Sequence, residues 1–160
     1  STEAGHLNIS AKIKKESLEQ IIEVFRNKTG RMPTFEDFLS GKGLNFFYCV
    51  LSDQEECSLT NEEILSNYNT DGVCLEVKES MNYLYAAYLR YIALAWGALG
   101  GVYLAGSITN SLLFDIDNIK FSQVFADSET MNSLLKATPI FRVKPQDLGF
   151  RGALKLAREL

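Results

Sequence analysis

The stretch Gly-Gly-Val-Tyr-Leu-Ala-Gly-Ser at residues 100–107 decides the class of fold that this sequence predicts. Its four apolar residues, 102–105, stand between glycines and show no alternation of apolar and polar side chains. Such a run is typical of a strand in a parallel sheet that is covered on both faces. The sequence therefore predicts an α/β fold in which a buried strand ends at Gly106.

The carboxyl end of that strand is a candidate binding site. Gly106 lets the backbone turn where a side chain would collide with a ligand, and the next helix is expected over residues 108–114. In open α/β sheets nucleotides lie at this place, against the first turn of the following helix. These residues alone leave a second interpretation open, because a glycine-flanked strand also occurs as plain architecture.

The rest of the sequence predicts mostly helices. Apolar residues at helical spacing predict a helix over 16–28, and a longer pattern over 75–97, with a stripe from Met81 to Trp96, predicts the core helix. Thr34 with Asp37, and Thr60 with Glu63, are typical of helix starts. Other expected elements are a helix over 44–51 after a glycine-rich turn at 40–43, short helices over 121–127 and 129–137, a strand over 139–143, a helix over 149–159, and a strand end over 3–9.

Size, charge and cysteine usage restrict the class of protein. The 160 residues suit a single domain over 1–160 with a sizeable core. A net charge of −4 with scattered basic residues argues against nucleic acid or an anionic membrane as a partner. The three cysteines and the one histidine share no metal-ligand spacing, so we expect no metal site. The odd cysteine count and the absence of a secretory pattern predict a cytoplasmic location.

One segment is long enough to suggest a membrane span. Residues 91–114 carry no charge and exceed the usual spanning length of about 20 residues. Four glycines interrupt the segment, however, and its second half contains several polar residues. We therefore expect a buried helix followed by a buried strand, and no membrane partner.

Three motifs in a fixed order resemble those of bacterial-type glucokinases. They are Glu-Ala-Gly-His at 3–6, Glu-Asp-Phe-Leu-Ser-Gly-Lys-Gly-Leu at 36–44 and Gly-Gly-Val-Tyr-Leu-Ala-Gly at 100–106. Those enzymes carry similar motifs at comparable spacings, and the resemblance spans the whole chain. It implies the helix-rich C-terminal lobe of the actin-like ATPase (ribonuclease H-like) fold, with few strands, within the hexokinase/actin-like ATPase superfamily.

The resemblance implies that Glu3, His6 and Glu36 contact the sugar. Carboxylates and an imidazole suit this role, since each sugar hydroxyl both donates and accepts hydrogen bonds. The residues by themselves leave another interpretation open. Glu36 also fits an ordinary negative charge at a helix start, and His6 also fits a structural histidine.

The resemblance also implies a nucleotide site and ATP with Mg²⁺ as the cofactor. It places Gly106 and Ser107 on the adenosine and phosphate side, and Gly149 and Gly152 beside the adenine. Ser107 stands where the family usually has a second glycine. The sequence Gly149-Phe-Arg-Gly152 likewise departs from the commoner Gly-Leu-Leu-Gly pattern.

The family's N-terminal motifs do not occur in this sequence. These are the Asp-x-Gly-Gly-Thr phosphate loop and an Asn-Asp pair whose Asp deprotonates the sugar 6-hydroxyl. The resemblance thus implies the C-terminal part of an enzyme that makes glucose 6-phosphate, with the N-terminal lobe absent, no catalytic residue of its own and no activity in isolation.

Two other functions stay open at this point. The chain could be a non-catalytic sugar-sensing or interaction module of the same fold, or a helical scaffold without a ligand. In every case we expect self-association as a homodimer, because a missing lobe leaves apolar surface and a sheet edge uncovered.

Overall fold

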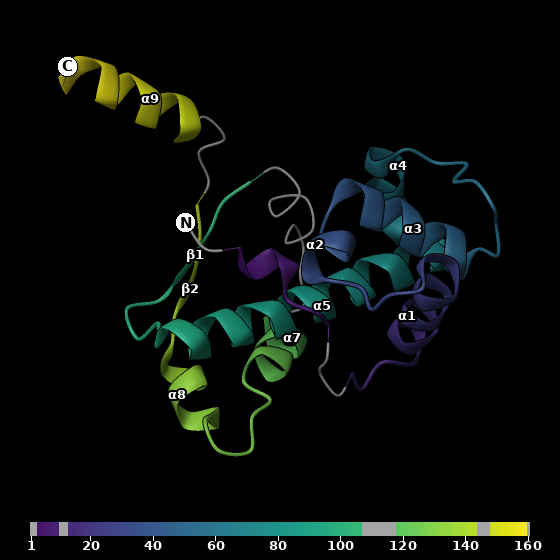
Figure 1. Cartoon of the computed structure of the whole chain (residues 1–160), viewed down its shortest axis with the longest axis horizontal. Helices are drawn as coiled ribbons and strands as arrows, with labels where there is room; N and C mark the ends of the chain where they lie inside the picture. The colour runs from purple at the N-terminus through teal and green to yellow at the C-terminus, as the bar shows by residue number, and fades with distance from the viewer. Residues whose placement is uncertain (1–2, 10–12, 107–117, 144–147, 160) are drawn as a thin grey trace.

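The computed structural model describes residues 3–9, 13–106, 118–143 and 148–159. Over these residues the chain is rich in helix and has one pair of strands, as Figure 1 shows. The described elements are the 3-10 helix η1 (Ala4–His6), α1 (Glu16–Thr29), α2 (Phe35–Phe38), α3 (Gly41–Leu51), α4 (Asn61–Ser66), the 3-10 helix η2 (Asn67–Asn69), α5 (Gly72–Trp96), β1 (Val102–Leu104), α7 (Asn118–Phe125), α8 (Asn132–Ala137), β2 (Ile140–Arg142) and α9 (Leu148–Glu159).

The longest helix, α5, organises the molecule and confirms the predicted core helix. It begins three residues earlier than expected, because the Asp71 side chain caps it by accepting from the N–H groups of Val73 and Cys74. Gly97, with a φ of +58°, ends it. Its 25 residues span about 37 Å at about 1.5 Å per residue, so one helix reaches both parts of the core.

Two clusters of buried side chains pack along α5. The first joins α5 to α1, α2 and α3, and the second joins its C-terminal half to the strands, α7 and α8. Trp96 was expected on the buried stripe, but 54% of its surface is exposed. This part of the prediction is wrong because the helix extends beyond the second cluster. The main buried side chains are Leu18, Ile21, Phe38, Phe47, Met81 and Leu84 in the first cluster and Leu89, Ala93, Val102, Leu104, Phe125 and Leu135 in the second.

The two expected strands are present, and the prediction of a parallel sheet is confirmed. β1 pairs with β2 in parallel, with Val102 opposite Ile140 and Leu104 opposite Arg142. Val102 and Leu104 are buried, whereas Tyr103 between them is 67% exposed and stacks on Phe141 of β2. The expectation of a sheet covered on both faces is therefore wrong for the described residues. A purely apolar run of four residues cannot show that one of its faces lies open.

Several other element boundaries differ from the sequence-based expectation, among them the start of α7, which lies at Asn118 and not at 121. The N-terminal segment forms the 3-10 helix η1 and a single antiparallel bridge between Asn8 and Thr34, not the end of a strand. Helix α3 begins at Gly41, because Ser40 accepts a hydrogen bond from the Gly43 N–H, so the expected glycine-rich turn is the first turn of the helix. Helix α8 begins at Asn132, three residues late. Within the described residues, no helix combines the length and apolar character needed to cross a bilayer.

Candidate functional site

The N-terminal segment is held against the start of α2 by backbone hydrogen bonds. The Ile9 N–H donates to the Pro33 carbonyl at 2.9 Å, and the Phe35 N–H donates to the Leu7 carbonyl at 3.1 Å. Ile9 is also buried in the first core cluster. These bonds bring the predicted motif at residues 3–6 next to the motif at 36–44, across about thirty residues of intervening chain.

Helix α2 is short, and its start is strongly capped. Thr34 and Asp37 form a complete capping box, in which Asp37 Oδ2 accepts from the Thr34 N–H at 2.8 Å. Arg31 adds a two-pronged ion pair to Asp37, at 2.7 and 2.8 Å. Hydrogen bonding from Arg31, together with that from Thr34, holds the pKa of the Asp37 carboxyl well below its usual range. The sequence correctly predicted this helix start.

Between these anchors, Glu36 points its carboxylate at the N-terminal motif. His6 Nε2 lies 3.3 Å from Glu36 Oε2 and 3.5 Å from Glu3 Oε2. All three side chains are more than 60% exposed, so a solute can reach them. The structure therefore brings together the three residues that the resemblance assigned to the sugar, while their role as sugar contacts stays a prediction.

Glycine at position 5 suits this arrangement. A Cβ added at Gly5 would lie 3.5 Å from the Glu36 Cβ and 3.6 Å from Glu36 Oε2, which is ordinary van der Waals contact. A longer side chain there would extend toward the carboxylate. The small residue keeps the space beside Glu36 open.

Three aromatic rings pack together next to Glu36 and fix the position of α2. Phe35 is buried, and its ring lies 4.9 Å from that of Tyr88 and 5.8 Å from that of Tyr91, both on α5. Burial, and to a smaller extent the negative charge of Glu36, raise the pKa of the Tyr88 hydroxyl. Sequence reasoning placed Tyr88 in the core stripe alone, because helical spacing does not reveal which carboxylate of another element lies near it.

A wide open hollow of about 1060 Å³ adjoins the three residues, and His6 and Glu36 line it. Sequence reasoning missed its other polar lining residues. Lys42 and Asn45 belong to α3, whose first residues are part of the second motif. Their position in or next to that motif was the sequence signal that could have identified them as lining residues. Lys28 and Asn61 come from α1 and α4, and only the tertiary fold brings them here.

The residues that the resemblance assigned to the nucleotide are only partly described by the structure. Gly106 lies two residues after the end of β1 and has a φ of +126°, a conformation that favours glycine, as expected for a turn after the strand. Ser107 and the helix expected over 108–114 lie outside the described residues. The earlier glycine of the same motif, Gly101, has a structural role. With a φ of +110°, it has room for no Cβ, which would lie 2.7 Å from the Phe141 ring and 2.9 Å from the Pro139 carbonyl oxygen.

Gly149 and Gly152 lie on α9, which extends away from the other helices in Figure 1. A Cβ added at either glycine would meet no heavy atom within 4 Å among the described residues. Close packing within the described chain is therefore not what these glycines serve. Their place beside an adenine stays a prediction. Among the described residues, no group of three or more His, Cys, Asp or Glu side chains could hold a metal ion.

Comparison with known proteins identifies a single family. The family model described as "Glucokinase" matches residues 1–160. The glucokinase of Psychromonas ingrahamii is 26% identical over 156 residues, which cover 94% of this chain and 48% of that protein. The glucokinase of Chromobacterium violaceum is 28% identical over 148 residues, which cover 88% of this chain and 41% of that protein.

A solved structure agrees at the level of the fold. The crystal structure of a glucokinase from an Antarctic psychrotroph superposes with a TM-score of 0.79 at 21% sequence identity. The match covers all of this chain and 50% of that one. The chain therefore spans about half the length of the curated relatives and of the solved structure that it matches.

Proposed function

Because this chain belongs to the glucokinase family, we propose that it is the C-terminal part of a kinase that transfers a phosphoryl group from ATP to glucose. In this proposal the chain folds as the C-terminal lobe of the actin-like ATPase fold, supplies sugar and nucleotide contacts, and acts in the cytoplasm. Glucose 6-phosphate would be the product of the complete enzyme, and it would enter glycolysis.

The observation that carries the proposal is the convergence of Glu3, His6 and Glu36 at one accessible point beside an open hollow. Glu36 is positioned from both sides, by the capped start of α2 and by Phe35 packed on Tyr88. A preorganised carboxylate accepts hydrogen bonds from neighbouring sugar hydroxyls at little entropic cost. His6, set between two carboxylates, is oriented to make a further directional bond to the sugar.

The nucleotide would bind at the end of β1. Gly106 has the backbone conformation that allows close approach of a phosphate or ribose, and Ser107 follows it. ATP with Mg²⁺ would supply the transferred phosphoryl group there. The residues of this chain would position the sugar and the nucleotide, which is the main source of catalysis in phosphoryl transfer.

The test is a calorimetric titration of the 160-residue chain with glucose. We expect glucose binding that Glu36→Gln weakens by about tenfold or more, since a sugar hydroxyl then loses a charged partner worth roughly 1 to 3 kcal/mol. Glu56→Gln, an exposed carboxylate in the loop after α3, is the matched control and leaves binding unchanged. Equal glucose affinity for the wild-type chain and Glu36→Gln would refute the sugar site.

Activity gives the second measurement. We expect no glucose phosphorylation by the 160 residues alone with ATP and Mg²⁺, because the phosphate loop and the base that the family uses are not among their motifs. We expect activity when the chain is joined to a lobe that carries those motifs. Turnover by the isolated chain that Glu36→Gln abolishes would overturn this expectation.

A second candidate function is a non-catalytic sugar-sensing module of the same fold. The observation that favours it is Ser107, which stands where the family usually has a glycine. If this candidate is right, the chain binds glucose but gains no activity when joined to a lobe with the phosphate loop. The Ser107→Gly variant would then restore phosphorylation.

A further inference from the structure

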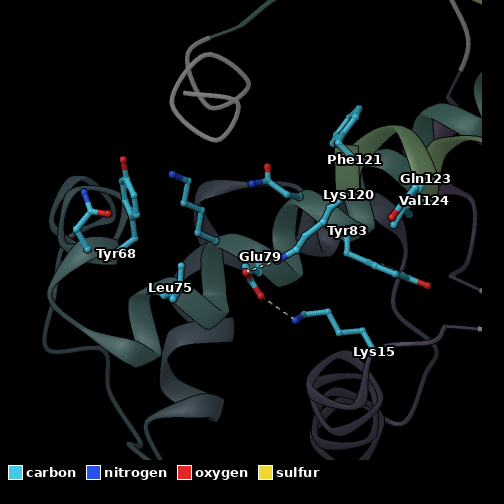
Figure 2. A pocket seen from close by; sticks show the side chains of 12 residues that line it. Lys15, Tyr68, Leu75, Glu79, Tyr83, Lys120, Phe121, Gln123 and Val124 are labelled. Carbon is cyan, nitrogen blue, oxygen red and sulfur yellow. Dashed lines mark hydrogen bonds and ion pairs between the residues drawn. The ribbon is translucent and has the colours of Figure 1, made fainter. Parts of the chain in front are cut away.

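Helix α5 borders two distinct places in its first half, a cavity and a cluster of thiols. Figure 2 shows the cavity, which is bounded by η2, α5 and α7 and has a volume of about 360 Å³. Lys78 and Asn82 line it, and so does Glu79, whose carboxylate forms ion pairs with Lys15 and Lys120. None of the three cysteines lines that cavity. They lie on α3, in the loop after α3 and in the first turn of α5.

Cys49 and Cys57 bring their thiols into contact. The Cys57 thiol donates to the Leu59 carbonyl oxygen at 3.0 Å and lies 3.6 Å from Asn45 Oδ1. Asn45 precedes Cys49 by four residues on α3, so the two side chains lie on the same face of that helix. The Cys57 thiol is accordingly hydrogen-bonded to the Cys49 thiol. Two thiols in contact need only side-chain rotation to close a disulfide.

The backbone between the two cysteines already forms a compact turn. The Gln54 N–H donates to the Cys49 carbonyl at 2.9 Å, and the Ser58 hydroxyl donates to Gln54 Oε1 at 3.0 Å. Only seven residues separate Cys49 from Cys57. Closing so short a loop costs little chain entropy, since its ends are held together in the thiol form.

The third thiol, Cys74, is not available for this chemistry. Its side chain is fully buried, with an exposed fraction of 0%, so an oxidant in solution does not reach the sulfur. Burial, followed by the nearby Asp71 carboxylate, raises the pKa of the Cys74 thiol. A protonated, buried thiol is a poor nucleophile. The structure therefore separates a reactive pair from an inert neighbour.

The two members of the pair differ in access and in charge. Cys57 is partly exposed and stands between the exposed residues 53–56 and the exposed Ser58, where a small oxidant can approach. Burial, followed by the neighbouring Cys57 thiol, raises the pKa of the Cys49 thiol. Cys49 therefore keeps its proton at neutral pH, and Cys57 is the sulfur that meets the oxidant first.

We propose that Cys49 and Cys57 form a reversible redox site, which a hydroperoxide closes to a disulfide. The Cys57 sulfur attacks one oxygen of hydrogen peroxide, the O–O bond breaks, and a sulfenic acid and one water form. The Cys49 sulfur then attacks the Cys57 sulfur, the S–O bond breaks, and the oxygen leaves with the Cys49 proton as a second water. Two thiols and one peroxide thus give one disulfide and two waters.

Closure changes one residue of the hollow beside Glu36. In the disulfide Cys57 carries no S–H, so Asn45 Oδ1 loses the thiol that lies beside it. Asn45 lines that hollow, and the exposed loop between the cysteines becomes tied covalently to α3. The redox site itself does not depend on the proposed sugar site, and its test uses no sugar.

The test counts thiols in the 160-residue chain after treatment with a small excess of hydrogen peroxide. We expect the number of thiols to fall from three to one, and dithiothreitol to restore all three. An endopeptidase that cuts after Glu55 and Glu56 separates the two cysteines, so their fragments stay joined only through the disulfide. Retention of three thiols, or a disulfide that includes Cys74 or joins two chains, would overturn the proposal.

Three variants assign the roles of the cysteines. Cys49→Ser stops the reaction at the Cys57 sulfenic acid, which dimedone labels, and Cys57→Ser leaves the other two thiols unoxidised. Cys74→Ser, whose hydroxyl can still donate to Asp71, is the matched control and closes the disulfide at the wild-type rate.

Circular dichroism checks the fold of each variant, and the mapping in the wild-type chain needs no variant. Dimedone labelling of Cys57→Ser as strong as that of Cys49→Ser would refute the role of Cys57. Loss of the disulfide in folded Cys74→Ser would refute the pairing, whatever the result with glucose.

Discussion

At the scale of single residues, Asp37 holds in place the start of α2, which carries the candidate sugar contact Glu36. Asp37 forms the capping box of α2 with Thr34 and an ion pair with Arg31. Glu36 lies between Thr34 and Asp37 in the sequence. The Asp37 side chain is 21% exposed, so its capping bonds are shielded from much of the solvent. The position of Glu36 thus depends on a neighbour that is not one of the candidate sugar contacts.

Asp37→Asn tests this role through stability and its pH dependence. The pKa of Asp37 is lowered in the folded state, so its contribution to stability is present above the ordinary Asp pKa of about 4 and is lost as pH falls below it. We expect the variant to lose about 1 to 2 kcal/mol at pH 7, mostly from the cap because Arg31 is half exposed.

Urea unfolding followed by circular dichroism measures the effect at pH 7 and at lower pH. The difference between wild type and Asp37→Asn should shrink as pH falls from about 4 to 2. Asp53→Asn is the control, since Asp53 is exposed and asparagine tolerates its positive φ of 54°. A difference that grows on acidification would contradict the assignment.

At the scale of elements, the junction between α2 and α3 fixes how the two helices of the second motif pack together. Gly43 lies in the first turn of α3, and an added Cβ would overlap the Phe38 carbonyl at the end of α2. That neighbour is backbone in a buried region, so it cannot move aside cheaply. The glycine of the motif therefore serves helix packing.

Gly43→Ala should destabilise the chain by roughly 3 kcal/mol, because the two helices must separate to admit one methyl group. Gly72→Ala is the matched control at the start of α5, where an added Cβ meets nothing within 4 Å. We expect Gly72→Ala to be neutral or up to about 1 kcal/mol more stable. Thermal unfolding compares the two, and equal melting temperatures would contradict the packing role of Gly43.

At the scale of the whole molecule, apolar side chains remain uncovered at the end of the second core cluster. Trp96 is the last residue of α5, Leu99 follows the helix, and Tyr103 stacks on Phe141 on the open face of the strands. Their exposed fractions run from 42% for Phe141 to 68% for Leu99. Clusters of this kind mark interaction surfaces.

We therefore expect the 160-residue chain to self-associate, with a homodimer as the first species, as the sequence analysis predicted. Sedimentation velocity over a hundredfold range of concentration measures it. Replacing Tyr103 and Phe141 with threonine should shift the equilibrium toward monomer, since both rings leave the open face. Ile119→Thr, a 72% exposed residue on α7, is the control. A monomer at every concentration would contradict the prediction.

Much of the fold could be predicted from local patterns. Capping residues set the starts of α2 and α4, and helical spacing revealed α1 and α5. These signals depend on neighbours within a few residues, so the sequence carries them directly. The family, the strand that forms β1 and the three candidate sugar residues also came from ordered local motifs. Such motifs can be detected without knowledge of the tertiary packing.

What the sequence left open depends on contacts between distant segments. The Cβ positions at Gly43 and Gly101 collide with residues of other elements, and Tyr88 comes near Glu36 only because α5 passes beneath α2. The cavity at Lys78 and Asn82 likewise needs η2 and α7 to close around one face of α5. Sequence by itself determined the elements and their chemistry; only the tertiary structure decided which side chains share a space, since burial and proximity arise when separate elements pack.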